Sequence, residues 1–410
     1  KIAALVVSFR AEFLGRAGFA RDRQPRPLSL APGAINNGRV TVEGLNADFD
    51  LKNVNGGITI TGVSGNDISF APAINADYLG AGGTCKISFR GTSATVSRSG
   101  VENISFRDGG GEYVKFQGTD ECWAKNLKTY GVGTGTVHIY PYINFRTEIR
   151  HCDMSHMTDL TNSTYCIQPI HCSNLLIIDN HFHDCPNVMP TSPWSGSAFA
   201  YNYVNDLPYS PSNWLSQIVF AHGCHSHYNL YEGNWCATSY NDFSASGEQS
   251  HSRNTTWLRN RMRGYDATGP KTSNIQAFTT ETHHDNITLA GNVLGENGVH
   301  TIYSGTSGAH VLEFDATSAA TVDLVANYNT VNDAIPAAEA LGGGEELVTS
   351  YLYSTKPSWF GNLPWPPITP TNFAQSNNSQ NIPAGFRAAN GADPSAAPAP
   401  GVVAGFGVTP

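Results

Sequence analysis

The chain has 410 residues, and only 14% of them are Asp, Glu, Lys or Arg, while glycine occurs 41 times. So few charges among so many turn-forming residues exclude a bundle of exposed helices and favour an all-β fold of short strands. A net charge of −9 without a basic run excludes a nucleic-acid-binding surface, and no run of about 20 apolar residues predicts a membrane-spanning helix.

Residues 1–37 show no clear period and are expected to form an N-terminal cap, with one amphipathic helix at Ser8–Ala20. A solenoid needs such a cap because its first coil would otherwise expose an apolar end. From Gly38 onward, short runs of alternating apolar and polar residues are separated by Gly and Asn, which is typical of strands. We assign residues 38–331 to one repetitive β-domain.

The central part of the chain contains a repeat built around asparagine. In five segments an apolar or aromatic residue stands three positions before the asparagine, and an apolar residue stands two positions after it. Less perfect copies extend the repeat in both directions, and in one of them Asp153 replaces the asparagine. Neighbouring copies lie 22 to 35 residues apart, as expected when coils stack in register while loops absorb insertions. The repeat asparagines are Asn126, Asn180, Asn202, Asn234, Asn260, Asn292 and Asn327.

Asparagine suits the corner of a coil for two reasons. The backbone at a corner often bends through the left-handed region, which asparagine tolerates. Its side-chain amide also donates and accepts, so stacked asparagines can bond one another along the solenoid axis. The spacing therefore predicts a parallel β-helix with an asparagine ladder, and the alternative is an antiparallel sandwich in which the spacing is coincidental.

The stretch from Val101 to Asn329 resembles the pectate-lyase-like superfamily of right-handed parallel β-helices in this ladder and coil pattern. The ending from Lys356 to Gly391 (KPSWFGNLPWPP to IPAGFRAANG) resembles the closing segment of secreted bacterial β-helix repeat proteins whose activity is uncharacterised. The resemblance implies the fold and an extracellular or cell-surface location. No G-D-D, G-H-G or R-I-K motif and no compact Asp cluster is present, so no catalytic residue is carried over.

The last 80 residues have a different character. Residues 332–391 are expected to form a short helix at Ala334–Leu347 and then an irregular strap rich in Pro, Trp and Phe. Residues 392–410 are rich in Pro, Ala and Gly and have the composition of a linker or tail. The eight cysteines contain no C-x-x-C pair, so disulfides are expected to be accessory, and several cysteines to be buried apolar residues.

Candidate functional residues come from a histidine repeat. Counting nine positions back from the five clearest repeat asparagines gives a histidine in four cases, so these side chains are expected at one corner of successive coils. A strip of His, Glu and Arg could supply a general acid, a general base and a cation for a substrate carboxylate. The predicted catalytic residues are His225, His251, His283, Glu248, Glu281 and Arg253, and the predicted substrate-binding residues are Trp194, Trp214, His222, His227 and Asp285. A structural histidine ladder or a metal site would explain the same strip.

A second cluster joins residues of one coil to residues of the next, namely His151, Asp153, His156 and Asp159 to His181, His183 and Asp184. His181 and His183 flank Phe182, so both should point away from the core. An H-x-H pair can chelate a metal ion, but no further ligand is evident from the sequence, and we interpret the cluster as a solvated polar loop.

The leading hypothesis is a secreted, polysaccharide-active β-helix protein, either a glycoside hydrolase or a polysaccharide lyase, with a groove along the His/Glu/Arg strip. No cofactor is predicted, although a bound divalent metal ion is left open. The alternative is a non-enzymatic structural, adhesive or filament-forming protein that self-associates through its end coils or tail, because a β-helix hosts many functions.

Overall fold

The computed structural model describes residues 96–390 except for short gaps, together with five strands nearer the N-terminus. The gaps are 134–136, 161–163, 210–212, 217–218, 222–225, 243–251, 268–270, 283, 306–308, 315–320, 343–344 and 370–378. The expected N-terminal helix and the tail at 392–410 lie outside the described residues. No helix in the described part has both the length and the apolar character that a membrane crossing requires.

The five N-terminal strands form a sheet of their own, in the order β1-β4-β3-β2-β5, and every pairing in it is antiparallel. The first parallel pairing joins β6 to β10, so the predicted start of the parallel β-helix at residue 38 is too early. Alternation of apolar and polar residues identifies strands but carries no information on the direction in which they pair. The strands are β1 (Leu28–Ser29), β2 (Arg39–Leu45), β3 (Asn55–Ser64), β4 (Asp67–Ala71), β5 (Thr84–Arg90), β6 (Val96–Ser97) and β10 (Thr119–Asp120).

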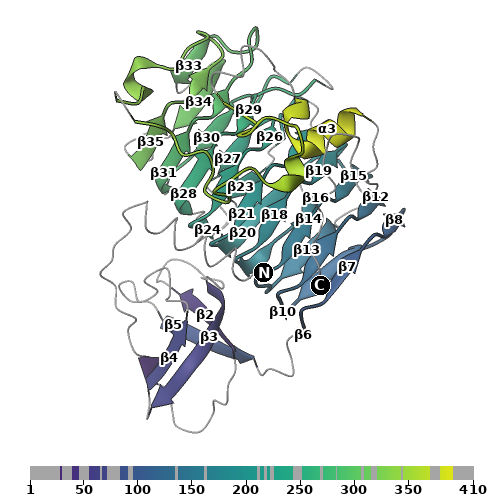
Figure 1. Ribbon diagram of the computed structural model, residues 1–410. Coiled ribbons are helices and arrows are strands. Elements are labelled where there is room, and N and C mark those ends of the chain that lie inside the picture. The colour runs from purple at the N-terminus through teal and green to yellow at the C-terminus, as the bar shows by residue number, and fades with distance from the viewer. Residues whose placement is uncertain are drawn as a thin grey trace.

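The remaining strands stack in parallel as the three walls of a β-helix, which confirms the predicted fold class (Figure 1). The first wall precedes the asparagine corner and contains β7 (Gly100–Glu102), β11 (Trp123–Lys125), β14 (Glu148–Arg150), β18 (Leu176–Ile178), β21 (Ala198–Ala200), β25 (Leu230–Glu232), β28 (Ser252–Leu258), β31 (Asp285–Ala290) and β35 (Val322–Val325). The second wall follows the corner and contains β8 (Ser105–Arg107), β12 (Lys128–Val132), β15 (Asp153–Met157), β19 (His181–His183), β22 (Tyr203–Asn205), β26 (Trp235–Cys236), β29 (Arg261–Met262), β32 (Val293–Leu294) and β36 (Tyr328–Asn329).

The third wall closes each coil and joins the first wall in one 20-stranded sheet. Its strands are β9 (Val114–Gln117), β13 (Val137–Tyr142), β16 (Tyr165–Ile167), β17 (Ile170–Ser173), β20 (Met189–Ser195), β23 (Val219–Ala221), β24 (Ser226–His227), β27 (Ser239–Asn241), β30 (Phe278–Thr280), β33 (Ile302–Gly305) and β34 (His310–Phe314).

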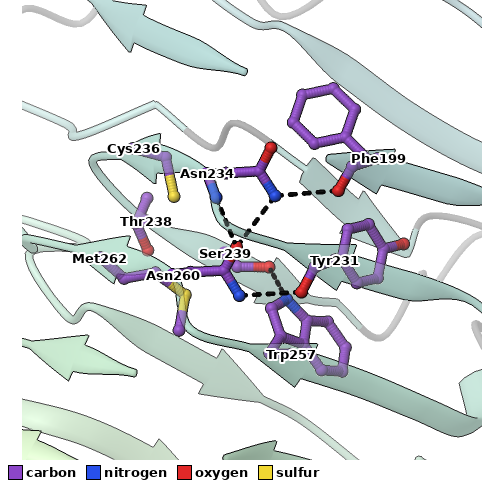
Figure 2. Close-up of a pocket in the computed structure, with 9 residues that line it drawn as sticks. All are labelled: Phe199, Tyr231, Asn234, Cys236, Thr238, Ser239, Trp257, Asn260 and Met262. Atoms are coloured by element: carbon purple, nitrogen blue, oxygen red, sulfur yellow. Dashed lines mark hydrogen bonds between the residues drawn. The ribbon is translucent and has the colours of Figure 1, made fainter. Parts of the chain in front are cut away.

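Like residues stack inside the walls. On the second wall Phe182 and Val204 are partners in register, and so are Cys236, Met262 and Leu294, and all five are buried in one apolar core. Each such side chain contributes roughly 1.5–3 kcal/mol by leaving water. The small cavity in Figure 2 lies within this core, so it is a gap in the packing rather than an open site.

Six asparagines form a column at the corner between the first and second walls, running from Asn180 to Asn327. In Figure 2, Asn234 donates through Nδ2 to the carbonyl of Phe199 at 2.9 Å and to Oδ1 of Asn260 at 2.9 Å. The side chain of Glu339 closes the column by accepting from the backbone N–H of Asn327 at 3.2 Å and from its Nδ2 at 2.9 Å. The column consists of Asn180, Asn202, Asn234, Asn260, Asn292 and Asn327.

The left-handed bend falls on the residue before each column asparagine, not on the asparagine itself. Asp179, Tyr201 and Arg259 have φ of 54°, 55° and 53°. Two imperfect copies of the repeat are each displaced by one position. Asn126 aligns with the bend residue His151, because its strand pairs Trp123 with Glu148, and Asp153 aligns with His181 rather than with Asn180. Trp123 imitates the apolar residue of the repeat but points outward.

The C-terminal strap covers the outer face of the first wall. Arg259 donates to the carbonyls of Val348 at 3.0 Å and Leu347 at 3.1 Å, while Trp359 and Phe360 join an apolar cluster on that face. Where a helix was expected at Ala334–Leu347, the described residues contain one 3-10 turn. The helical elements are η3 (Ala337–Glu339), η4 (Ser358–Phe360), η5 (Ser379–Asn381) and α3 (Pro383–Ala389). In Figure 1 the yellow helix α3 lies beside β19.

Candidate functional site

The outer face of the second wall carries a row of polar and aromatic side chains across β15, β19 and β22. Because Phe182 points into the core, its neighbours His181 and His183 point outward. The register pairs Asp153 with His181 and then Tyr203, and it pairs His183 with Asn205. The imidazoles predicted to lie in a solvated loop are therefore held on a strand, with a carboxylate on the strand below.

One carboxylate oxygen joins the two imidazoles. Oδ1 of Asp153 accepts from Nε2 of His183 at 3.1 Å, and Nδ1 of His181 lies 3.6 Å from the same oxygen. Nε2 of His181 donates to Oδ1 of Asn205 at 2.8 Å, because an amide oxygen can only accept. The two imidazole rings stack with centroids 4.4 Å apart, so the pair is fixed as a unit.

The charges of this group follow from its surroundings. Burial acts to raise the pKa of Asp153, but the hydrogen bond from His183 and the nearby His181 and Lys128 outweigh it, and the pKa lies below its ordinary value. Burial lowers the pKa of His181 to about 4 in spite of Asp153. At neutral pH the carboxyl of Asp153 is ionised and the imidazole of His181 is neutral.

A second group of acids lines the corner that follows the second wall, where His156, Asp184 and Asp206 have positive φ in successive coils. Nδ1 of His156 lies 2.7 Å from Oδ2 of Asp184. Burial raises the pKa of Asp206, and Asp266 raises it further, whereas His183 lowers it. His183 thus influences one carboxyl with a lowered pKa and another with a raised pKa.

Aromatic rings flank this cluster. Tyr130 stacks on His156 with centroids 4.7 Å apart, and the guanidinium of Arg107 lies 4.6 Å from the centre of the Tyr130 ring. On the next coil Tyr203 stacks on His181 at 5.2 Å. Partly exposed rings beside cations and acids are the groups that bind sugar faces and acidic sugars.

The predicted His/Glu/Arg strip is described only in part. The register places three of its residues side by side on neighbouring strands, because His227 pairs with Arg253 and Arg253 with Asp285. Arg253 forms an ion pair with Asp285, and Glu281 accepts from the hydroxyl of Tyr240. The predicted residues His222, His225, His251, His283 and Glu248 lie outside the described residues, so the strip stays a prediction.

The two predicted sugar platforms differ. Trp194 is 1% exposed and packs in the core near Tyr231, so its expected role as a platform is wrong. The surrounding Pro, Ser and Gly suggest a loop, but Trp194 lies within β20 of the third wall and points inward. Trp214 is half-buried and forms a bridge to Ser273, and its role stays a prediction.

Two groups of side chains among the described residues have the donor atoms and the spacing for a metal ion. One is Asp153, His181 and His183 on the outer face, and the other is His138, Cys166 and Cys185 in the interior. In each group the ligand atoms all lie within 4.8 Å of one another. The sequence already grouped Asp153 with His181 and His183, although as a polar loop, but it gave no sign of the second set, whose three ligands come from three different coils.

No protein-family model and no curated protein matches the sequence. Among solved structures, the chain is similar to the tailspike gp61 of Pseudomonas phage phi297, with 14% identity over 75% of this chain and 55% of that chain and a TM-score of 0.49. It is similar to the tailspike gp49 of Pseudomonas phage LKA1, with 11% identity over 65% and 46% and a TM-score of 0.37.

Pectate lyase Pel9A matches with 10% identity over 61% of this chain and 72% of that chain, with a TM-score of 0.28. The chain spans about half the length of the two tailspike chains. No residue role is taken from any of these structures. The parallel walls show that the chain folds as a parallel β-helix, the fold class that its repeat predicts.

Proposed function

We propose that the protein cleaves a polysaccharide on the outer face of the second wall, with His183 as the base and Asp206 as the acid. The observation that supports this most is the pair of carboxyls near His183 whose pKa values shift in opposite directions. An active site can keep one acid protonated and another ionised at one pH by shifting their pKa values in opposite directions.

The roles follow from the hydrogen bonds. Ionised Asp153 accepts from Nε2 of His183, which leaves Nδ1 of that ring with a lone pair to take a proton. Asp206, with its raised pKa, keeps its proton to higher pH and can give it to the leaving oxygen of a glycosidic bond. Hydrolysis and β-elimination both need one base and one acid, so the arrangement supports either reaction.

The surroundings favour an acidic or neutral glycan as the substrate. Lys128 lies beside Asp153 on the same face, and Arg107 is exposed above the Tyr130 ring. These cations would hold a uronate carboxylate, and the rings would lie against sugar faces. An extended polymer also matches a face that repeats every ~4.8 Å along the axis. Such a polymer would be met outside the cell, in line with the predicted extracellular location.

The test is a digestion panel of acidic and neutral polysaccharides that follows reducing ends and unsaturated-uronide absorbance together. We expect His183→Ala and Asp206→Asn each to lower cleavage by roughly 10²–10⁴-fold with unchanged circular dichroism and melting temperature. New ends with absorbance identify a lyase, and new ends alone identify a hydrolase.

A His225→Ala, His251→Ala double variant is the matched comparison, because it removes imidazoles from the other predicted strip. Cleavage lost only in that variant would move the active site to the strip and overturn the proposed residues. No cleavage of any glycan by the folded protein would favour the structural alternative, which electron microscopy for filaments would then examine.

A further inference from the structure

The interior of the solenoid contains a histidine for which no hydrogen-bond partner exists among the described residues. His138 on β13 is fully buried, and neither Nδ1 nor Nε2 is bonded. Its ring lies 5.8 Å from the ring of Tyr113, which supplies no bond to a ring nitrogen. Leaving a polar group buried without a partner costs roughly 1–3 kcal/mol, which an apolar residue at this position would avoid.

Two thiols lie beside this imidazole. The register pairs Val137 with Tyr165 and Ile139 with Ile167, which places Cys166 directly opposite His138 on the neighbouring strand. Cys185 comes from the corner that follows β19. Both cysteines are free and fully buried, and one ring nitrogen of His138 and the two Sγ atoms all lie within 4.8 Å of one another.

The chemistry of these three groups is that of a thiophilic metal site. Neither ring nitrogen of His138 has a hydrogen-bond partner among the described residues, so a nitrogen lone pair is available to a metal ion. Two thiolates would balance the charge of a divalent ion, so the loaded site would be neutral overall and would suit a buried position. In the metal-free protein the thiol of Cys185 donates to the carbonyl of His183 at 3.2 Å, a bond that would be lost when metal binding releases the thiol proton.

We propose that His138, Cys166 and Cys185 bind one Zn²⁺ ion inside the solenoid. Zinc accepts sulfur at ~2.3 Å and nitrogen at ~2.0 Å, which puts tetrahedral ligands about 3.5–3.8 Å apart. The three ligand atoms lie within 4.8 Å of one another, so each distance would shorten by about 1.3 Å at most. The bound ion would tie the third wall to the end of β19 across neighbouring coils. Binding would release the two thiol protons and stabilise the fold. This site is separate from the outer-face cluster and stands independently of the proposed cleavage.

The test is a Co²⁺ titration of the full chain, reduced and stripped of metal by a chelator. We expect one equivalent of Co²⁺ to give thiolate charge-transfer absorbance, which Zn²⁺ abolishes by displacement, and Zn²⁺ to raise the melting temperature. The cluster of Asp153, His181 and His183 has no sulfur, so Co²⁺ bound there would lack that absorbance. Cys166→Ser should remove the absorbance, whereas Cys172→Ser, at another buried core cysteine, should keep it.

A His138→Leu variant keeps the proposal testable if the serine variants unfold. Leucine removes the unpaired imidazole, so the metal-free variant should melt at or above the temperature of the metal-free wild type, and Zn²⁺ should no longer raise it. The proposal is overturned by a Cys166–Cys185 disulfide in the purified protein, by no charge-transfer absorbance in the reduced folded chain, or by equal loss in Cys166→Ser and Cys172→Ser.

Discussion

Replacing Asn234 by alanine tests how much the asparagine column contributes to stability. Asn234 donates through Nδ2 to the carbonyl of Phe199 at 2.9 Å and to Asn260 at 2.9 Å. Its Oδ1 accepts from the backbone N–H of Asn202 at 2.9 Å and from Nδ2 of Asn202 at 3.1 Å. Alanine removes all four of these bonds in the middle of the column.

The magnitude follows from the groups left behind. The carbonyl of Phe199 and the backbone N–H of Asn202 lose the partner that Asn234 gave them, and both residues are at most 1% exposed. Nδ2 of Asn202 keeps its hydrogen bond to the carbonyl of Ile177, so it loses only one of its two acceptors. At roughly 1–3 kcal/mol for each buried unpaired group, we expect a loss of about 3–5 kcal/mol. That is a large share of a typical stability of roughly 5–15 kcal/mol.

Urea unfolding followed by circular dichroism measures this loss. The control is Asn286→Gly, since Asn286 also donates to a stacked asparagine, Asn254 at 3.1 Å, but lies exposed and at positive φ, which glycine accepts. The control should lose less than about 1 kcal/mol, because water replaces the lost bond. Equal losses in the two variants would show that stacking of asparagines, and not their burial, determines the stability, and the reasoning would then be wrong.

Three further changes test the packing around the corner. Arg387→Ala leaves the buried carboxylate of Asp179 without the guanidinium 2.7 Å away, and denaturation should show a loss of roughly 3–5 kcal/mol. Gly233→Ala places a Cβ at a φ of 67° and against the ring of Tyr201, so the melting temperature should fall. An unchanged melting temperature would contradict the close packing of Gly233 on that ring. Burial lowers the pKa of His181 from 6.5 to about 4, so the unfolded chain takes up a proton at this residue before the folded protein does. The free energy of unfolding should therefore be highest above pH 6.5 and fall by roughly 3 kcal/mol as the pH falls toward 4. Urea midpoints across that range should decline less in His181→Gln.

The sequence was sufficient to predict the fold because the residue that repeats is the one that makes the hydrogen bonds between coils. An asparagine that must bond the next coil recurs once per coil, so Asn180 to Asn327 could be aligned without a structure. The alignment failed where another residue imitates the pattern. Trp123 stands three positions before Asn126, yet it faces outward and donates to Glu102 at 2.6 Å, which displaces that copy by one position.

The outer-face cluster was harder to find because its members come from different coils. H-x-H was visible in the sequence, and Asp153, 28 residues before His181, was grouped with it. The repeat copy of Asp153 was aligned one position off, however, so the direct pairing of Asp153 with His181 was not predicted. His138 gave no signal at all, since a histidine followed by Ile and Tyr in a strand has no pattern that distinguishes burial from exposure.

The C-terminal strap decides which carboxyls can meet a substrate. Asp179 and Glu232 have raised pKa values from burial, as catalytic acids often do, but they lie at 0% and 1% exposure beneath the strap. Asp179 pairs with Arg387, and Glu232 accepts from the backbone N–H of Tyr351 at 2.8 Å, so both hold the strap to the wall. Asp206 also has a raised pKa, but it lies at the second corner and is partly exposed.

The two kinds of acid should therefore respond in opposite ways to the loss of their charge. Glu232→Gln leaves the backbone N–H of Tyr351 an acceptor but weakens the bonds that hold the strap, so it should lower the melting temperature and leave the cleavage rate of the folded protein within about twofold. Asp206→Asn should lower the cleavage rate and leave the melting temperature unchanged, because its carboxyl is partly exposed and gives the strap no bond among the described residues. Parallel loss of activity and stability in both variants would contradict this division, since it would mean that the strap and the outer face act as one structural unit.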